Sequence, residues 1–188
     1  SLYNEETDES GRYVVPDSVE IISEYAFYKS ACQTVVLNNN VKQIGFMAFY
    51  DCEELTSIVN AEAVERIEGW AFESCRNLKS ITLGSKLTYI GDGAFYGCQS
   101  ITDIQLPPSI TEINRHTFYG CTNLQAIVIP KSVGRIRSWA FGNCSSLKEV
   151  KIPEGIKWIN PGCFRGCKSL TNIDPVSYTH LRAHETGR

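Results

Sequence analysis

Cysteine is the residue type whose number and spacing first suggest chemistry in this sequence. Six of the eight cysteines follow one another at intervals of 23 residues: Cys52, Cys75, Cys98, Cys121, Cys144 and Cys167. A structural zinc site usually takes ligands from Cys-x-x-Cys pairs, and the chain has none; Cys163 and Cys167 are four residues apart. Disulfides between equivalent cysteines remain an alternative, although identical side chains in stacked units point the same way. We therefore expect a ladder of buried thiols and no metal.

Asp103 and Glu149 are the carboxylates whose spacing suggests catalysis. If both face outward from stacked strands, they lie two strands apart, or ~9.6 Å. Inverting glycosidases hold their two carboxyl groups ~6.5–9.5 Å apart. An open sheet provides no enclosed pocket for a substrate, and Lys151 lies beside Glu149 on the same side of its strand. We therefore expect no enzyme activity and no cofactor.

Histidine offers no better case for catalysis. Two of the three histidines, His180 and His184, lie in the C-terminal tail. The third, His116, occupies a position that holds unrelated residue types in the neighbouring units, such as Trp70 and Gly93. A general base at such a variable position is not expected, because a base must be held in a fixed geometry.

The 23-residue interval also governs the apolar residues, so the chain contains an internal repeat. Each unit follows the pattern V-x-x-I-x-x-x-A-F-x-x-C-x-x-L-x-x-I-x-L-P. Its phenylalanines are Phe27, Phe49, Phe72, Phe95, Phe118, Phe141 and Phe164. The first interval is 22 residues, and Cys32 takes the position of the leucine rather than that of the cysteine. One unit has too little surface to bury alone, so the units are expected to stack.

The apolar positions within the unit predict its elements. The L-x-x-I-x-L half alternates as a strand does, and stacked copies form a parallel sheet with ~4.8 Å between strands. Pro107, Pro130 and Pro153 end these strands, because proline cannot donate to the ladder. The V-x-x-I half returns along the opposite face. For the A-F-x-x-C corner we expect a short turn, a 3-10 turn or a single helical turn.

These motifs resemble the BspA-like leucine-rich repeat family, the 23-residue class with the strand signature C-x-x-L-x-x-I-x-L-P. Residues 121–130, CTNLQAIVIP, carry the signature, and the resemblance extends over residues 13–174. It implies a right-handed, curved leucine-rich repeat solenoid of about seven repeats with the parallel sheet on its concave side. It also implies a secreted or surface-displayed protein of bacteria or protozoa. Members of the family are associated with adhesion to host matrix proteins and to other cells.

The sequence outside residues 13–174 is not repetitive. Residues 1–12 form an acidic N-terminal extension that we expect to be mobile. Residues 13–16 are predicted to be the last strand of an incomplete leading repeat. Residues 175–188 match nothing in the repeat and resemble translated sequencing-adapter read-through, so we exclude them from functional interpretation.

Two surfaces are candidates for binding. On the concave face the outward-pointing candidates are Ser80, Thr82, Asp103, Gln105, Val128, Glu149 and Lys151. Beside the phenylalanines an aromatic rim is predicted from Trp70, Tyr96, Tyr119 and Trp139. Tyrosine and tryptophan often anchor partners. The alternatives are that the strand charges only suppress aggregation and that the rings only pack on one another.

Composition limits the kind of partner. The chain has 188 residues, of which 43% are hydrophobic and 21% charged, with a net charge of −3. That hydrophobic content excludes a disordered chain. The slight acidity argues against nucleic-acid binding, which needs a basic surface. No run of about 18 apolar residues is present, so we expect no membrane insertion.

These observations predict a non-enzymatic extracellular or cell-surface module. It would bind a host matrix or cell-surface protein, as the resemblance implies, through the concave face. The alternative is a structural spacer whose repeats present another domain of a larger surface protein. Neither the identity of the protein ligand nor the oligomeric state follows from the sequence.

Overall fold

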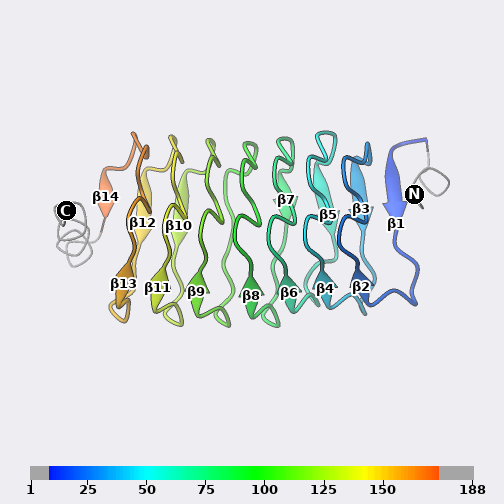
Figure 1. Cartoon of the computed structure of the whole chain (residues 1–188), viewed down its shortest axis with the longest axis horizontal. Helices are drawn as coiled ribbons and strands as arrows, with labels where there is room; N and C mark the ends of the chain where they lie inside the picture. Colours follow the sequence, from blue (N-terminus) through cyan, green and yellow to red (C-terminus); the bar gives the residue numbers. More distant parts are fainter. Residues whose placement is uncertain (1–8, 174–188) are drawn as a thin grey trace.

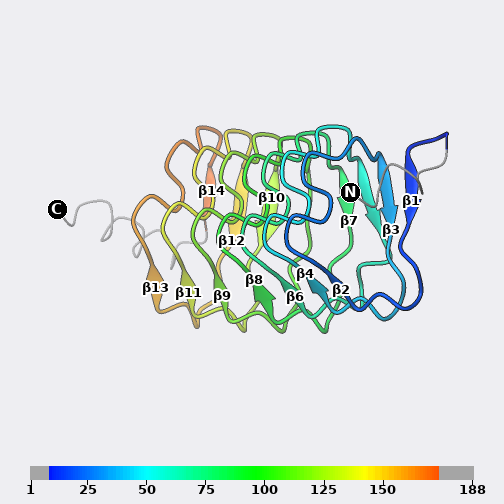
Figure 2. The same ribbon diagram turned by 45° about the vertical axis from the view of Figure 1, so that its right-hand side comes forward.

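A computed structural model describes residues 9–173, which form a solenoid of two parallel β-sheets joined by tight corners (Figure 1, Figure 2). The predicted repeat solenoid is thereby confirmed. Residues 1–8 and 174–188 lie outside the described residues, and with them most of the acidic extension and the whole C-terminal tail. The predicted leading strand is present, since a strand covers Arg12–Val14.

Strands of the two sheets alternate along the chain. Those of the first sheet, built from the L-x-x-I-x-L half, are β1 (Arg12–Val14), β3 (Thr34–Val36), β5 (Ser57–Val59), β7 (Ser80–Ile81), β10 (Ala126–Val128), β12 (Glu149–Lys151) and β14 (Asn172–Ile173). Those of the second sheet, built from the V-x-x-I half, are β2 (Ile21–Ile22), β4 (Gln43–Ile44), β6 (Arg66–Ile67), β8 (Tyr89–Ile90), β9 (Glu112–Ile113), β11 (Arg135–Ile136) and β13 (Trp158–Ile159). We call their outward sides the first and the second sheet face.

Strand register follows the repeat, because each residue pairs with its own equivalent. Val35 lies opposite Ile58, and Ile127 lies opposite Val150, in parallel ladders. Each sheet is nevertheless interrupted once. The first is ordered β1-β3-β5-β7 and then β10-β12-β14, and the second β2-β4-β6-β8 and then β9-β11-β13. Residues 101–106, which fit the repeat pattern, therefore form no strand between β7 and β10.

Between residues 9 and 173 the corners are short turns, as one of the expected conformations has it, and contain no helical turn. Each corner has two residues with positive φ four positions apart, for example Met47 at 52° and Asp51 at 54°. A left-handed residue cannot continue a right-handed helix. Between these two residues, the N–H of Phe49 donates to Ala71 of the next repeat at 2.8 Å, whereas that of Tyr50 donates back to Met47 at 3.2 Å. The corner is thus a run of short turns bonded to its neighbour.

The core is a single stack of parallel phenylalanine rings. From Phe27 to Phe164, successive ring centroids lie 4.8–5.6 Å apart and the rings are within 10° of parallel. The five inner rings, those of Phe49, Phe72, Phe95, Phe118 and Phe141, are completely buried. Since isoleucine and leucine side chains of both sheets pack around this stack, it joins the two sheets into one core.

A ladder of thiols runs beside the phenylalanines. The Sγ of Cys52 donates to the carbonyl of Phe27 at 2.9 Å, and Cys121 donates likewise to Phe95 at 3.2 Å. The other in-register cysteines make the same bond to the phenylalanine of the preceding repeat. All eight cysteines are free. Burial raises the pKa of Cys121 to about 12, so this thiol stays protonated at neutral pH.

The short first repeat shows how one missing residue is accommodated. In a regular repeat the N–H of Leu55 donates to the carbonyl of Cys52 at 3.2 Å. In the first repeat Ser30 occupies the cysteine position, and Cys32 follows it one residue too early to make that bond. The N–H of Cys32 donates instead to the hydroxyl of Ser30 at 3.1 Å. The serine hydroxyl therefore satisfies a buried backbone donor.

Removing one ring from the phenylalanine stack should destabilise the whole solenoid. We expect Phe95→Ala to lower the free energy of unfolding by ~3–5 kcal/mol, because it leaves a cavity between Phe72 and Phe118. Urea denaturation followed by circular dichroism measures this loss. Phe46→Ala is the control, since that ring is 37% exposed. An equal loss in both variants would contradict the structural role of the stack.

The thiols should react slowly with Ellman's reagent at pH 8 in the native chain. Thiolate is the reactive species, and burial both raises the pKa of Cys98 and hides its sulfur. Cys167 is only partly buried and should react first. In guanidinium chloride all eight thiols should react at once. Fewer than six reactive thiols in the unfolded, non-reduced chain would show that disulfides interrupt the ladder.

Candidate functional site

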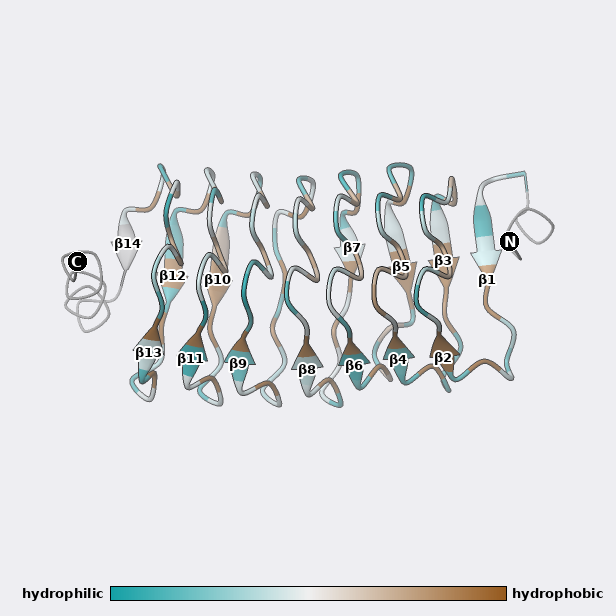
Figure 3. Ribbon diagram, in the orientation of Figure 1, coloured by the Kyte–Doolittle hydropathy of each residue, from teal (hydrophilic) through white to brown (hydrophobic). Residues whose placement is uncertain are grey.

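The first sheet face carries all seven candidate residues predicted for it, and every one of them is exposed: Ser80, Thr82, Asp103, Gln105, Val128, Glu149 and Lys151. Their neighbours Ile127 and Val150 are buried, as the alternation of a strand requires. Figure 3 shows β10 as an apolar strand beside the mixed polar and apolar colours of β12. On this face the apolar outward residues of β10 therefore lie next to the charged outward residues of β12.

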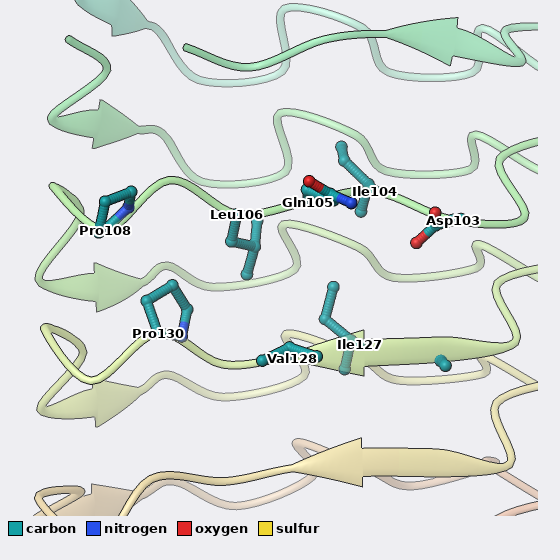
Figure 4. A pocket seen from close by; sticks show the side chains of 9 residues that line it. Asp103, Ile104, Gln105, Leu106, Pro108, Ile127, Val128 and Pro130 are labelled. Carbon is teal, nitrogen blue, oxygen red and sulfur yellow. The ribbon is translucent and has the colours of Figure 1, made fainter. Parts of the chain in front are cut away.

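Three of the seven residues meet in one shallow groove. Asp103, Gln105 and Val128 line a hollow of about 350 Å³ on this face (Figure 4). The remaining lining residues are Ile104, Leu106, Pro108, Ala126, Ile127 and Pro130. Figure 4 shows the two prolines at one end of the groove and Asp103 at the other. The other four candidates lie on the same face but outside the groove.

Two local features explain the position of the groove. It lies where the first sheet is interrupted, since one wall is the segment 103–106 and the other is β10. Ala126 contributes only a methyl group, although it stands between Asp103 in the preceding repeat and Glu149, its strand partner. A small residue between two acidic ones leaves space that a longer side chain would fill.

Apolar and polar residues lie in different parts of this groove. Its floor and proline end are apolar, whereas Asp103 and Gln105 are polar and exposed. In the described part of the chain neither Asp103 nor Glu149 takes part in an ion pair. An exposed carboxylate without a partner is free to bind a cation from outside. The arrangement suits a side chain with an aliphatic stem and a basic end.

Catalytic and metal-binding arrangements receive no support from these residues. Asp103 and Glu149 stand on an open sheet, and Lys151 is exposed beside Glu149. Among residues 9–173 no group of three or more histidine, cysteine, aspartate or glutamate side chains is placed to hold a metal ion. The geometry favours contact with a large surface over enclosure of a small substrate.

The four residues of the predicted aromatic rim contact one another. The rings of Tyr96 and Tyr119 are stacked with centroids 4.8 Å apart, Trp70 lies 5.8 Å from Tyr96, and Trp139 lies 6.3 Å from Tyr119. His116 sits among them, 5.7 Å from Tyr119. All are partly buried, and burial raises the pKa of Tyr96. Much of the surface of these rings is therefore covered by their contacts with one another.

Glycines make room for the two tryptophans of the rim. A Cβ on Gly93 would lie 2.0 Å from Cε3 of Trp70, and one on Gly162 would lie 2.8 Å from Cδ2 of Trp139. Both glycines have positive φ, 61° and 75° respectively. Glycine is thus required here for space as well as for backbone conformation.

The second sheet face was overlooked as a candidate surface by the sequence interpretation. Arg66 lies over the ring of Tyr89, with 4.2 Å from its Cζ to the ring centroid, and Arg135 lies 4.4 Å over Trp158. These cation–π pairs join neighbouring repeats on the outside of the sheet. A signal was available, because each residue directly precedes the buried isoleucine of its V-x-x-I motif.

The stacked repeats with a parallel sheet on one side define a class, that of the leucine-rich repeat solenoids. Within this class the chain belongs to the family of BspA type leucine rich repeat regions, which matches it in six copies over residues 6–125 and 88–182. The predicted family is therefore confirmed. No curated protein matches the chain. No helix between residues 9 and 173 is long and apolar enough to cross a membrane.

Solved structures from bacteria share the fold. A leucine-rich repeat protein from T. pallidum has a TM-score of 0.85 and 27% identity, over 96% of this chain and 86% of that one. One from Bacteroides ovatus has a TM-score of 0.75 and 30% identity, over 79% and 39%. A leucine rich cell surface protein from Faecalibacterium prausnitzii has a TM-score of 0.65 and 28% identity, over 88% and 55%. The chain spans less than two thirds of the last two proteins.

Filling the space under Trp70 should disturb the aromatic rim. We expect Gly93→Ala to destabilise the chain and to shift the tryptophan fluorescence, because the added methyl group overlaps the indole. Gly120→Ala is a matched control, since its φ is also positive, at 72°, but its Cβ would approach only Gly97, at 3.7 Å. Both variants pay ~1–2 kcal/mol for a left-handed alanine. Equal melting temperatures for the two would contradict the close packing of Trp70.

Proposed function

We propose that this chain is a non-enzymatic recognition module that binds another protein through its first sheet face. The observation that carries this proposal is the groove at the interruption of the sheet. It brings Asp103, Gln105 and Val128 together on this face. An apolar depression with polar and charged residues at its border resembles the core and rim of protein interfaces.

The chemistry of the groove specifies the part of the ligand that it would hold. A lysine or arginine of the partner would lay its stem along Leu106 and Val128 and bring its charge to Asp103. Glu149 lies close by, next to Ala126, and adds a second negative charge. Thr82 and Ser80 would extend the contact on the other side of the groove. The ligand is accordingly a protein with an exposed basic segment.

We place the module at the cell surface or outside the cell, where its ligand would be a host matrix or cell-surface protein. A solved relative of the same fold is a cell surface protein of F. prausnitzii. Extended faces of solenoids also suit large ligands, since each repeat adds contact area of the same shape. The buried, hydrogen-bonded thiols are compatible with an oxidising environment, because a thiol that solvent does not reach is not readily oxidised.

Charge reversal in the groove should weaken binding without unfolding the chain. We expect Asp103→Lys to weaken binding at least ~10-fold, because like charges across an interface repel. Surface plasmon resonance against a panel of matrix proteins, including fibronectin and fibrinogen, measures the effect. Glu54→Lys carries the same change of charge at an exposed corner and is the matched control.

Two outcomes would overturn this proposal. If Asp103→Lys and Glu54→Lys weaken binding equally, only net charge matters and the groove is not the site. If a folded chain binds no member of the panel, the repeats are better explained as a spacer that presents another domain. In that case outward substitutions on the first sheet face should be without effect.

A further inference from the structure

The second sheet face carries a pattern that is complementary to itself. Its outward side chains in order from β2 to β13 are Ile21, Gln43, Arg66, Tyr89, Glu112, Arg135 and Trp158. When these residues are paired from the two ends inward, the first pair, Ile21 and Trp158, is apolar. The third pair, Arg66 and Glu112, is oppositely charged. Tyr89 stands alone at the centre. The residues that precede the first and last of these, Glu20 and Lys157, are also oppositely charged and exposed.

We propose that this face is an interface between two copies of the chain. The twofold axis lies in the interface, runs parallel to the strands and passes through β8. Such an axis reverses the order of the repeats but keeps the strand direction. Consequently β2 faces β13 of the partner, β4 faces β11, and β6 faces β9. The strands of the second sheet stand in one row along the solenoid, which allows this contact (Figure 1).

The charge pattern selects this axis over its alternative. A twofold axis along the solenoid would place Arg66 against the partner's Arg66 and Glu112 against the partner's Glu112. Like charges across an interface repel. With the axis parallel to the strands, Arg66 faces the partner's Glu112, and Glu20 faces the partner's Lys157. A shift by one repeat would bring Arg66 opposite the partner's Arg135 in one direction and opposite the partner's Tyr89 in the other, so of these registers only the unshifted one pairs Arg66 with a carboxylate.

The facing charges would extend ion pairs that already exist in each chain. The Nε of Arg66 donates to Glu68 at 2.8 Å. The carboxylate of Glu112 accepts from Arg137 at 2.9 and 3.3 Å. Joining the two pairs across the interface gives a row of four charges with alternating sign. Glu20 and Lys157 make no ion pair in the described part of the chain, so they would gain a partner on dimerisation.

The shapes of the two ends of the second sheet face favour the same axis as the charges do. A hollow of about 580 Å³ lies beside β2 and β4 and the residues that follow β6, and its lining includes Gly45 and Gly69, which have no side chain to fill it. Its exposed apolar residues are Ile21, 54% exposed, and Phe46, 37% exposed. At the opposite end Trp158 is 49% exposed. The proposed axis brings the partner's Trp158 to this hollow, and the same contact forms twice.

The distribution of charge along the solenoid supports the same orientation. Residues 9–92 contain 12 acidic and 7 basic side chains, a net charge of −5, whereas residues 93–173 contain 4 acidic and 9 basic ones, a net charge of +5. Two copies in opposite directions place the acidic half of each against the basic half of the other. Long-range attraction would therefore guide the encounter into this orientation. Both first sheet faces stay open.

Sedimentation equilibrium of the full chain at low salt tests the interface. The wild type should form a dimer whose Kd rises with salt concentration. Glu20→Lys and Lys157→Glu should each raise that Kd by at least ~10-fold, since each places like charges opposite. The double variant, Glu20→Lys with Lys157→Glu, should restore the wild-type Kd, because the pair is only exchanged. Lys79→Glu, an exposed lysine away from this face, is the matched control and should leave the Kd unchanged.

Trp158→Ala should also raise the Kd, since tryptophans that an interface buries in a pocket often carry much of its binding energy. A wild type that is monomeric at every concentration would overturn the proposal. So would a dimer that the two single charge variants leave intact. If both single variants are monomeric but the double variant is monomeric too, the proposed axis is wrong. Circular dichroism of each variant establishes that a loss of dimer is not a loss of fold.

Discussion

Every structural element of this chain depends on one constraint, that each residue must lie directly beside its equivalent in the next repeat. Parallel strands bond only to neighbours in the same register, and the corners obey the same rule, since Phe49 donates to Ala71 of the next repeat. Because of this constraint, a residue type that recurs at one position of the repeat forms a continuous column along the solenoid. One phenylalanine per repeat becomes a stack that is buried along its length, and one cysteine becomes a ladder of bonded thiols. Outward positions are aligned in the same way into columns, although their residue types differ from repeat to repeat.

The sequence predicted the features that recur with its 23-residue period. It did not predict the backbone conformation of the corners or the interruption of the sheets. Strands, the phenylalanine core and the thiol ladder follow from the period of 23. The helical turn expected as one alternative for the corners is not confirmed, since between residues 9 and 173 the bonds to the next repeat hold residues such as Met47 and His116 at positive φ. Gly93 and Gly162 occupy the same position in their repeats as Met47 and His116. They were the sign in the sequence that this corner position has positive φ. The interruption at residues 101–106 could not be predicted, since that segment keeps the apolar pattern of the strands around it.

The candidate sites differ in how much the sequence revealed of them. Exposure of Asp103, Gln105 and Val128 followed from strand alternation, but their meeting in one groove depends on the interrupted sheet and the small side chain of Ala126. The aromatic rim was expected by position, and its close contacts became visible only with the rings in place. The second sheet face was missed because its outward residues differ in type from repeat to repeat. Their complementarity appears only when the order of the outward residues from β2 to β13 is compared with the same order reversed.

The hydrogen bond from Cys32 to Ser30 has a consequence for how such a chain can evolve. Gain or loss of a whole repeat by gene duplication or recombination preserves every register, so the length of the protein can change in steps of one unit. A single-residue deletion inside a repeat breaks the register unless a nearby side chain replaces the lost backbone bond. Here the hydroxyl of Ser30 does so. A change in repeat length is thus tolerated where a side chain can take over the lost backbone bond, while units that lack such a side chain are held to one fixed length.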